Sequence, residues 1–184
     1  MKKILMIAVL MVATLSASAQ GMYLKPMVGG TLTTITGDGD DDAKMKVGLI
    51  AGAEFGYDFT ENMGITAGVL YAMQGCKSKL ADENMNLDYL NIPILFNYYV
   101  IPGLALKAGI QPGFLMRAKM DGHDLKDNFK KIDLAIPLGA SYEFSDFVID
   151  ARYNIGALFN IADHGDAKGH NSVLQVTLGY KIPF

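Results

Sequence analysis

The sequence predicts an all-β protein, an eight-stranded antiparallel up-and-down transmembrane β-barrel. Three observations support this fold class. Apolar and polar residues alternate with a period of two along stretches much longer than the roughly five or six residues of an ordinary strand. Glycine recurs on the polar face of these stretches, and the connections between them alternate between short and long. A tilted strand that crosses a bilayer needs about 9–11 residues with alternate side chains facing lipid, which these stretches provide.

The clearest stretch is a predicted hairpin at residues 131–156. In its first arm Leu134, Ile136 and Leu138 fall on one face, and the second arm has the same alternation. A short polar turn at Ser145-Asp146 separates the two arms, which is a typical β-hairpin pattern.

The other strands repeat this pattern in chain order. We expect the eight strands at residues 23–34, 45–58, 63–74, 90–99, 104–117, 131–144, 147–156 and 172–184. Outside the hairpin, their outward phases include Leu24, Val28 and Leu32; Val47, Leu49 and Phe55; Ile65, Val69 and Tyr71; Ile92, Ile94 and Phe96; Leu104, Leu106 and Ile110; and Leu174, Val176 and Leu178. Pro93, Pro112 and Pro137 fall inside strands, where we expect local bulges because proline cannot donate to the ladder.

The connections indicate how the barrel is oriented. Those near residues 60–62, 101–102 and 145–146 are short, and those near 35–44, 75–86, 121–128 and 160–171 are long and polar. Short turns at one end and long loops at the other are typical of outer-membrane barrels. We therefore expect an outer-membrane protein with both termini in the periplasm and the long loops outside the cell.

Residues 1–19 have the pattern of a secretory signal peptide. Lys2 and Lys3 precede an apolar run, and Ala17-Ser18-Ala19 matches a small-residue cleavage site. The run is too short for a membrane-spanning helix, so we expect the barrel domain to occupy residues 20–184. Without Lys2 and Lys3, 14 of the 16 basic residues remain against 19 acidic ones, which argues against a nucleic-acid partner. The single cysteine, Cys76, leaves no internal disulfide.

A soluble barrel with an apolar interior, as in lipocalins, would show the same alternation. Two features favour the membrane barrel. Glycines lie on the polar face, where they relieve crowding in a narrow lumen. The aromatic residues of the apolar face cluster beside the short turns, as in an aromatic girdle at a membrane interface. This girdle comprises Phe55, Tyr57, Phe96, Tyr98, Tyr142, Phe144, Phe147, Tyr180 and Phe184.

Charged residues in the inward phase predict an ion-pair network inside the barrel. The predicted members are Glu54, Lys107, Arg117, Asp133, Glu143, Asp150, Arg152 and Lys181. Buried charges must be paired, and an eight-stranded barrel has little room beyond its own side chains, so a structural plug is the favoured interpretation. A narrow or gated conduit is the alternative. We hypothesise that Glu143 pairs with Lys107 or Arg152.

The predicted loops offer weaker candidates for chemistry. The acidic segment 37–42 lacks the spacing of a calcium-binding EF-hand. Asp163, His164, Asp166 and His170 match no established metal motif, and residues as close as His170 and Ser172 seldom form a nucleophile–base pair. We therefore predict no cofactor, no metal site and no catalytic residues.

Several short motifs resemble the PorT-like outer-membrane β-barrel family. They are Tyr89-Leu90-Asn91-Ile92-Pro93-Ile94-Leu95, Leu70-Tyr71-Ala72-Met73-Gln74-Gly75, Arg152-Tyr153-Asn154-Ile155-Gly156 and Leu178-Gly179-Tyr180-Lys181-Ile182-Pro183-Phe184. The resemblance implies an eight-stranded barrel similar to OmpA and OmpX, but assigns no functional residues. Phe184 resembles the terminal aromatic residue by which the insertion machinery recognises barrel proteins, and one branch of the family is associated with secretion.

Three function classes follow. The leading one is a non-enzymatic barrel, in contact with outer-membrane lipid, that stabilises the membrane or binds an unknown surface ligand through its loops. The second is a narrow porin-like channel or a component of secretion machinery. The third is a surface enzyme that modifies lipids.

Overall fold

A computed structural model of the chain describes residues 21–37, 46–77, 84–120, 123–124, 132–156 and 169–184. These residues form strands β1 (Met22–Gly37), β2 (Lys46–Thr60), β3 (Met63–Lys77), β4 (Asn84–Asn91), β5 (Ile94–Ile101), β6 (Leu104–Met120), β7 (His123–Asp124), β8 (Ile132–Phe144), β9 (Phe147–Gly156), β10 (Gly169–Tyr180) and β11 (Ile182–Pro183). No helix of the described segments is long and apolar enough to cross a membrane.

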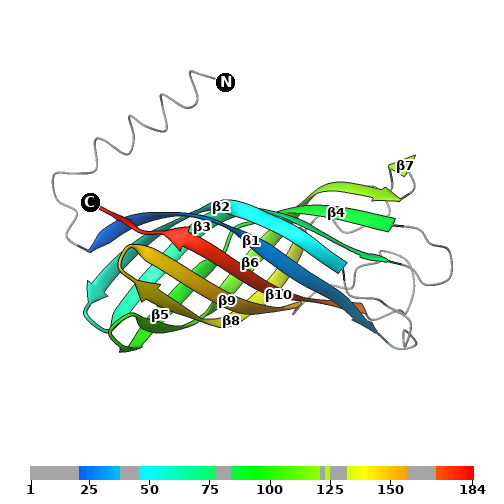
Figure 1. The fold of residues 1–184 in the computed structure, drawn as a ribbon. Helices are drawn as coiled ribbons and strands as arrows, with labels where there is room; N and C mark the ends of the chain where they lie inside the picture. The colour runs from blue at the N-terminus through cyan, green and yellow to red at the C-terminus, as the bar shows by residue number, and fades with distance from the viewer. Residues whose placement is uncertain (1–20, 38–45, 78–83, 121–122, 125–131, 157–168) are drawn as a thin grey trace, which may run out of the picture.

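The strands close into an antiparallel barrel (Figure 1). Neighbouring strands pair in the order β1–β2–β3–β4–β6–β8–β9–β10, and β1 also pairs with β10, which closes the sheet. Strands β4 and β5 act as one interrupted strand between β3 and β6, while β11 continues β10 along β1. The described residues therefore form a barrel of eight strands, with β4 and β5 counted as one strand and β10 and β11 as another. The two-residue β7 is an addition at the end of β6. The predicted fold class is confirmed.

Three short turns lie at one end of the barrel, together with the start of β1 and the C-terminus (Figure 1). They are Glu61-Asn62, Pro102-Gly103 and Ser145-Asp146, so the second lies one residue later than expected. The Phe184 amide donates to the Met22 carbonyl at 3.1 Å, which ties the chain end to β1. Of the four predicted long loops, residues 38–44, 78–83, 121–122, 125–128 and 160–168 lie outside the described residues, and the remaining residues of these segments belong to strands.

The two faces of the barrel differ as the alternation predicts. On β8, Ile136 and Leu138 are 42% and 46% exposed, whereas Glu54 and Arg152 are 0% and 1% exposed. Apolar side chains therefore point outward around the barrel, and charged side chains point into it. A continuous apolar belt of this kind would be a liability in water and requires hydrocarbon around it.

Apolar side chains also fill part of the interior. One buried cluster comprises Met27, Ile50, Leu70 and Ala72. A second comprises Leu87, Tyr89 and Leu115, contributed by β4 and β6. The lumen is thus packed with a polar portion and an apolar portion, as expected for a barrel of this size.

The regular ladder is interrupted at Pro93, within β6, and beside two of the short turns. Pro93 lies at the break between β4 and β5, where its carbonyl accepts from the Gly68 amide at 3.0 Å. The expected bulges at Pro112 and Pro137 are absent. Strands β6 and β8 keep one register through the pair Pro112–Leu134, and β8 and β9 keep one register through the pair Pro137–Asn154. A bulge instead occurs on β6, where Asp88 pairs with Arg117 but the next residue, Tyr89, pairs with Leu115.

Candidate functional site

Five charged side chains from four strands meet inside the barrel. Lys25 of β1 lies directly opposite Glu54 of β2. Lys107 of β6 and Arg152 of β9 lie on either side of Gly139 of β8, and Asp150 precedes Arg152 by one inward position. The two groups come from separate parts of the wall, so their side chains reach each other across the lumen. We call these five residues the interior network.

The interior network is held by short ion pairs. Arg152 contacts Glu54 at 2.5 Å through Nη1 and Asp150 at 2.6 Å through Nε. Lys25 pairs with Glu54 at 2.8 Å, and Lys107 pairs with Asp150 at 2.5 Å. Arg152 therefore bridges two lysine–carboxylate pairs, and its planar guanidinium suits this bidentate role.

Inward glycines make room for these side chains. Gly68 lies opposite Glu54, and a Cβ placed on Gly68 would be 2.6 Å from Cγ of Glu54. A Cβ on Gly179 would be 2.8 Å from Cγ of Lys25. Atoms do not approach this closely, so a larger residue at either position would push the network out of place.

The charges of the interior network do not cancel. Among the described residues, Lys25, Lys107 and Arg152 pair only with Glu54 and Asp150, which leaves one positive charge in excess. All five residues are at most 6% exposed. Charges buried to this extent are tolerated only when they are paired, so the balance of the network limits which substitutions the barrel can accept.

A second ionic cluster, the mouth cluster, lies at the short-turn end. Lys181 contacts Glu143 at 2.9 Å and Asp58 at 3.4 Å. Its ammonium also lies 4.4 Å from the centre of the Tyr23 ring, and the Tyr99 hydroxyl donates to Asp58 at 3.1 Å. This cluster carries one negative charge in excess, opposite to the excess of the interior network.

Two cavities show how far the mouth extends inward. An open depression of about 470 Å³ is lined by mouth-cluster residues, including Asp58, Glu143 and Lys181. Beneath it, next to Lys25 and Lys107, the space narrows to about 10 Å³, roughly the size of one water molecule. The depression therefore ends at the interior network.

Some expected network members lie elsewhere. Glu143 pairs with Lys181, and not with Lys107 or Arg152 as hypothesised. Asp133 forms no ion pair with another described side chain. Arg117 was expected inside the barrel, but its side chain is 60% exposed, because the β6 bulge shifts it to the outer face.

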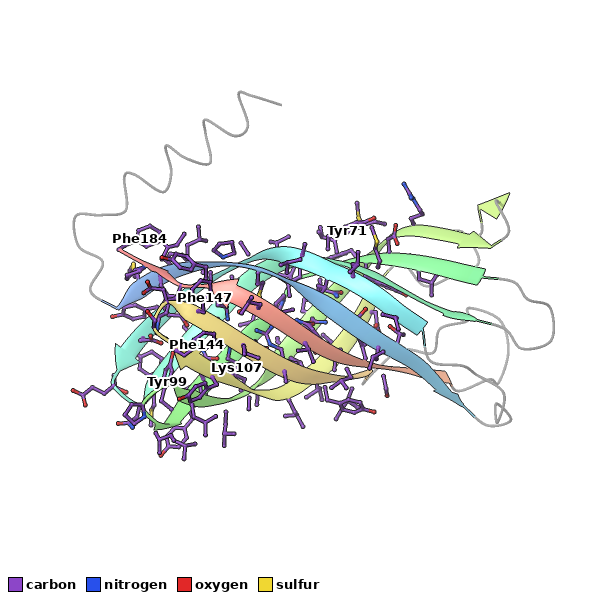
Figure 2. The ribbon with its side chains drawn as sticks, in the orientation of Figure 1. Tyr71, Tyr99, Lys107, Phe144, Phe147 and Phe184 are labelled. Atoms are coloured by element: carbon purple, nitrogen blue, oxygen red, sulfur yellow. The ribbon has the colours of Figure 1, made fainter. Side chains whose placement is uncertain are left out.

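On the outer face, Arg117 takes part in a different cluster. Its Nε lies 3.8 Å from the Asp88 carboxylate, and the Tyr71 hydroxyl donates to the same carboxylate at 2.7 Å. Figure 2 shows Tyr71 well away from the short-turn end, where Phe144, Phe147 and Phe184 lie. Sequence reasoning did not identify this cluster, because a one-residue bulge leaves no clear pattern in the sequence.

Sequence reasoning also omitted Lys25 from the network, although Lys25 has the inward phase of β1. Asp58 was missed in the same way. The alternation places both side chains on the inward face of their strands, but the sequence alone does not show which inward charges reach across the lumen.

The expected girdle residues other than Phe184 are exposed, and Figure 2 shows Phe144, Phe147 and Phe184 at the short-turn end. Exposures range from 37% for Phe55 to 50% for Tyr142, with Tyr57, Phe96, Tyr98, Phe144, Phe147 and Tyr180 between them. Phe147 makes an edge contact with Tyr180 at 5.3 Å and stacks on Phe144 at 5.8 Å. Phe59, not expected in the girdle, joins Tyr57 to Phe96 through contacts of 6.3 Å.

The residues considered for catalysis or metal binding are only partly covered by the described segments. Ser172 is 7% exposed and therefore has poor access to a substrate. Within the described ranges, no group of three or more His, Cys, Asp or Glu side chains could hold a metal ion. Asp163, His164, Asp166 and most of the 37–42 segment lie outside those ranges.

A closed barrel with an apolar outer belt and a packed ionic interior defines the class of transmembrane β-barrel proteins. The sequence places the chain within this class. Residues 5–181 match the family model described as outer membrane protein beta-barrel domain, and the chain belongs to this family. It is an outer-membrane β-barrel protein.

Solved structures share this fold. The attachment invasion locus protein Ail of Yersinia pestis, solved with the heparin analogue sucrose octasulfate, has a TM-score of 0.58 and 17% identity over 89% of this chain and 100% of its own. Neisserial surface protein A has a TM-score of 0.60 and 14% identity over 91% and 99% of the two chains. OprG of Pseudomonas aeruginosa has a TM-score of 0.50 and 15% identity over 90% and 98%. No curated protein matches the sequence significantly.

Proposed function

We propose that this protein is a non-enzymatic scaffold of the outer membrane that stabilises the membrane or binds a partner through its long loops. The observation that carries the proposal is the filled lumen. Arg152 bridges carboxylates across the barrel, and the apolar clusters occupy further interior space. A barrel braced in this way is rigid, so the parts that remain for recognition are its loops.

The same packing argues against the alternative of a narrow porin-like channel. The depression at the short-turn end narrows to about 10 Å³ beside Lys25 and Lys107. Planar-bilayer recording tests this point. We expect no steady current from the purified protein. A stable conductance that changes when Lys107 is replaced by methionine would favour the channel.

The proposed topology has both termini in the periplasm and the long loops outside the cell. It is supported by the shared position of the three short turns, the start of β1 and the C-terminus. Protease treatment of intact cells tests it: cleavage should occur within residues 38–45, 78–83 or 157–168 and spare the short turns. N-terminal sequencing of the surface protein should begin at Gln20 if residues 1–19 are a signal peptide.

Ligand binding through the loops is the leading role within this proposal. Ail, a barrel of the same fold, was solved with a heparin analogue, so ligand binding is compatible with this scaffold. Cells that display the protein should bind a host-surface or envelope ligand, and replacing residues 157–168 by a glycine–serine segment should reduce that binding. Unchanged binding after replacement of each long loop in turn would leave only the membrane-stabilising role.

The finer assignments are also proposals. We propose membership of the PorT-like family. Only its secretion-associated branch would give the protein a role in secretion, and a deletion strain with normal secretion would contradict that role. Phe184 is proposed to direct recognition by the insertion machinery, so deleting it should lower the amount of folded barrel in the membrane. Loss of lipid-modifying activity on changing Ser172 would instead favour a surface enzyme.

A further inference from the structure

A depression of about 420 Å³ lies on the lipid-facing surface over β1, β2 and β10. Its floor contains small residues, namely Pro26, Ala51, Gly52 and Gly179, and its rim at the short-turn end is formed by Phe147 and Tyr180. We call this depression the lipid-facing groove. It begins beside the Ser145-Asp146 turn and follows the strands toward the middle of the barrel.

The shape of the lipid-facing groove selects its occupant. The groove is apolar and lies in the belt that faces hydrocarbon, so a membrane component fills it. A second barrel presents a convex, rigid wall that would rest on Phe147 and Tyr180 and leave the floor empty. A single acyl chain is narrow and flexible, and it can lie along the floor while making dispersion contacts with the side chains that line the groove.

The end of the groove at the membrane interface adds a charge. Tyr180 donates its hydroxyl to the Asp146 carboxylate at 3.3 Å, and Asp146 is exposed next to Phe147. No described cation forms an ion pair with Asp146, since the nearby Lys181 pairs with Asp58 and Glu143. A carboxylate at the headgroup level favours a lipid headgroup that carries an ammonium group.

We propose that the lipid-facing groove binds one phospholipid with an ammonium headgroup, its acyl chain over Ala51 and Gly52 and its headgroup beside Asp146. The site is defined by the barrel surface alone and does not depend on the ligand or the orientation proposed above. It differs from the general contact of the belt with lipid in having a fixed position and a headgroup preference.

Native mass spectrometry of the folded, detergent-solubilised barrel tests this site. Phosphatidylethanolamine and phosphatidylglycerol with identical acyl chains are added in turn. Ala51→Phe fills the groove from its floor, and Ala108→Phe is the matched control, because Ala108 also faces outward but lies on β6, away from the groove. Heat-modifiable gel mobility verifies that each variant is folded, and Ala51→Ile replaces Ala51→Phe if the latter does not fold.

The expected result is one retained phosphatidylethanolamine in the wild type and in Ala108→Phe, and its loss in Ala51→Phe. Asp146→Asn should keep lipid binding but lower the preference for phosphatidylethanolamine over phosphatidylglycerol about two- to fivefold, the range that one exposed ion pair provides. Equal lipid retention by the two phenylalanine variants would overturn the groove as a site. An unchanged headgroup preference in Asp146→Asn would overturn the assignment of the headgroup.

Discussion

Replacing Glu54 by leucine should destabilise the barrel far more than replacing Arg152 by methionine. Without Glu54, Lys25 loses its partner at 2.8 Å, and the nearest remaining carboxylate in the network is Asp150 at 3.9 Å. Asp150 already holds Lys107 and Arg152, so three buried cations would share one carboxylate. Leaving a buried charge without its partner costs about 3–5 kcal/mol.

Replacing Arg152 has a different effect on the charge balance. The pairs Lys25–Glu54 and Lys107–Asp150 both remain, and the excess positive charge of the network disappears. Because Glu54 and Asp150 each keep a lysine partner, no buried charge is left unpaired, and we expect a loss below about 2 kcal/mol. The double variant Glu54→Leu, Arg152→Met restores the wild-type excess of one charge and should be no less stable than Glu54→Leu alone.

Urea-induced unfolding in lipid vesicles, followed by far-ultraviolet circular dichroism, measures these differences. The chain has no tryptophan, so intrinsic tryptophan fluorescence is not an option. Ile149→Leu, a lipid-facing change beside Asp150 on β9, is the control and should lie close to wild type. An Arg152→Met variant that is as unstable as Glu54→Leu would refute the reasoning from charge balance.

Three further predictions concern the wall of the barrel. Gly68→Ala should lower the free energy of unfolding by about 1–3 kcal/mol, because the added Cβ would lie 2.6 Å from Cγ of Glu54. The outward change Ala67→Leu is the control and should leave the free energy of unfolding unchanged. Equal effects of the two changes would contradict the crowding argument. Leu138→Arg should lower the free energy of unfolding in bilayers by about 2–4 kcal/mol, because Leu138 faces lipid near the middle of β8. An unchanged free energy of unfolding would place Leu138 outside the hydrocarbon. Tyr71→Phe should lower the free energy of unfolding by about 1.5–3 kcal/mol, because it removes the 2.7 Å hydrogen bond to the Asp88 carboxylate. Tyr153→Phe is the control. Equal stability of the two variants would show that this hydrogen bond contributes nothing.

The fold was predictable because the barrel imposes one simple rule on every strand. Alternation assigns each residue to lipid or lumen, and Leu138 and Arg152 obey it without regard to distant contacts. The rule fails where the backbone gains a residue. Met116 is the extra residue between the pairs Asp88–Arg117 and Tyr89–Leu115, and this single insertion moves Arg117 from the predicted interior to the outer face.

The membership of the interior network was less predictable. Alternation indicates that Lys107, Asp133 and Glu143 face inward. It does not indicate the position of each side chain along the barrel axis, or which strands it approaches across the lumen. Partner choice depends on the stagger between strands, and this stagger places Glu143 beside Lys181 at the mouth and Asp150 beside Lys107. The start of β4 at Asn84, earlier than its alternation begins, is likewise set by pairing with β3 and β6.

The reach of Arg152 across the lumen also has a consequence for biogenesis. Glu54 is synthesised early in the chain and Arg152 late, and they come into contact only when the wall has curved into a cylinder. In a partly assembled sheet Lys25 and Glu54 still neutralise each other across β1 and β2, but Arg152 and Lys107 share Asp150 alone, so a positive charge without its Glu54 partner would enter the bilayer at a high energetic cost. We therefore expect insertion and ring closure to occur as one concerted event, without a stable half-formed barrel along the way.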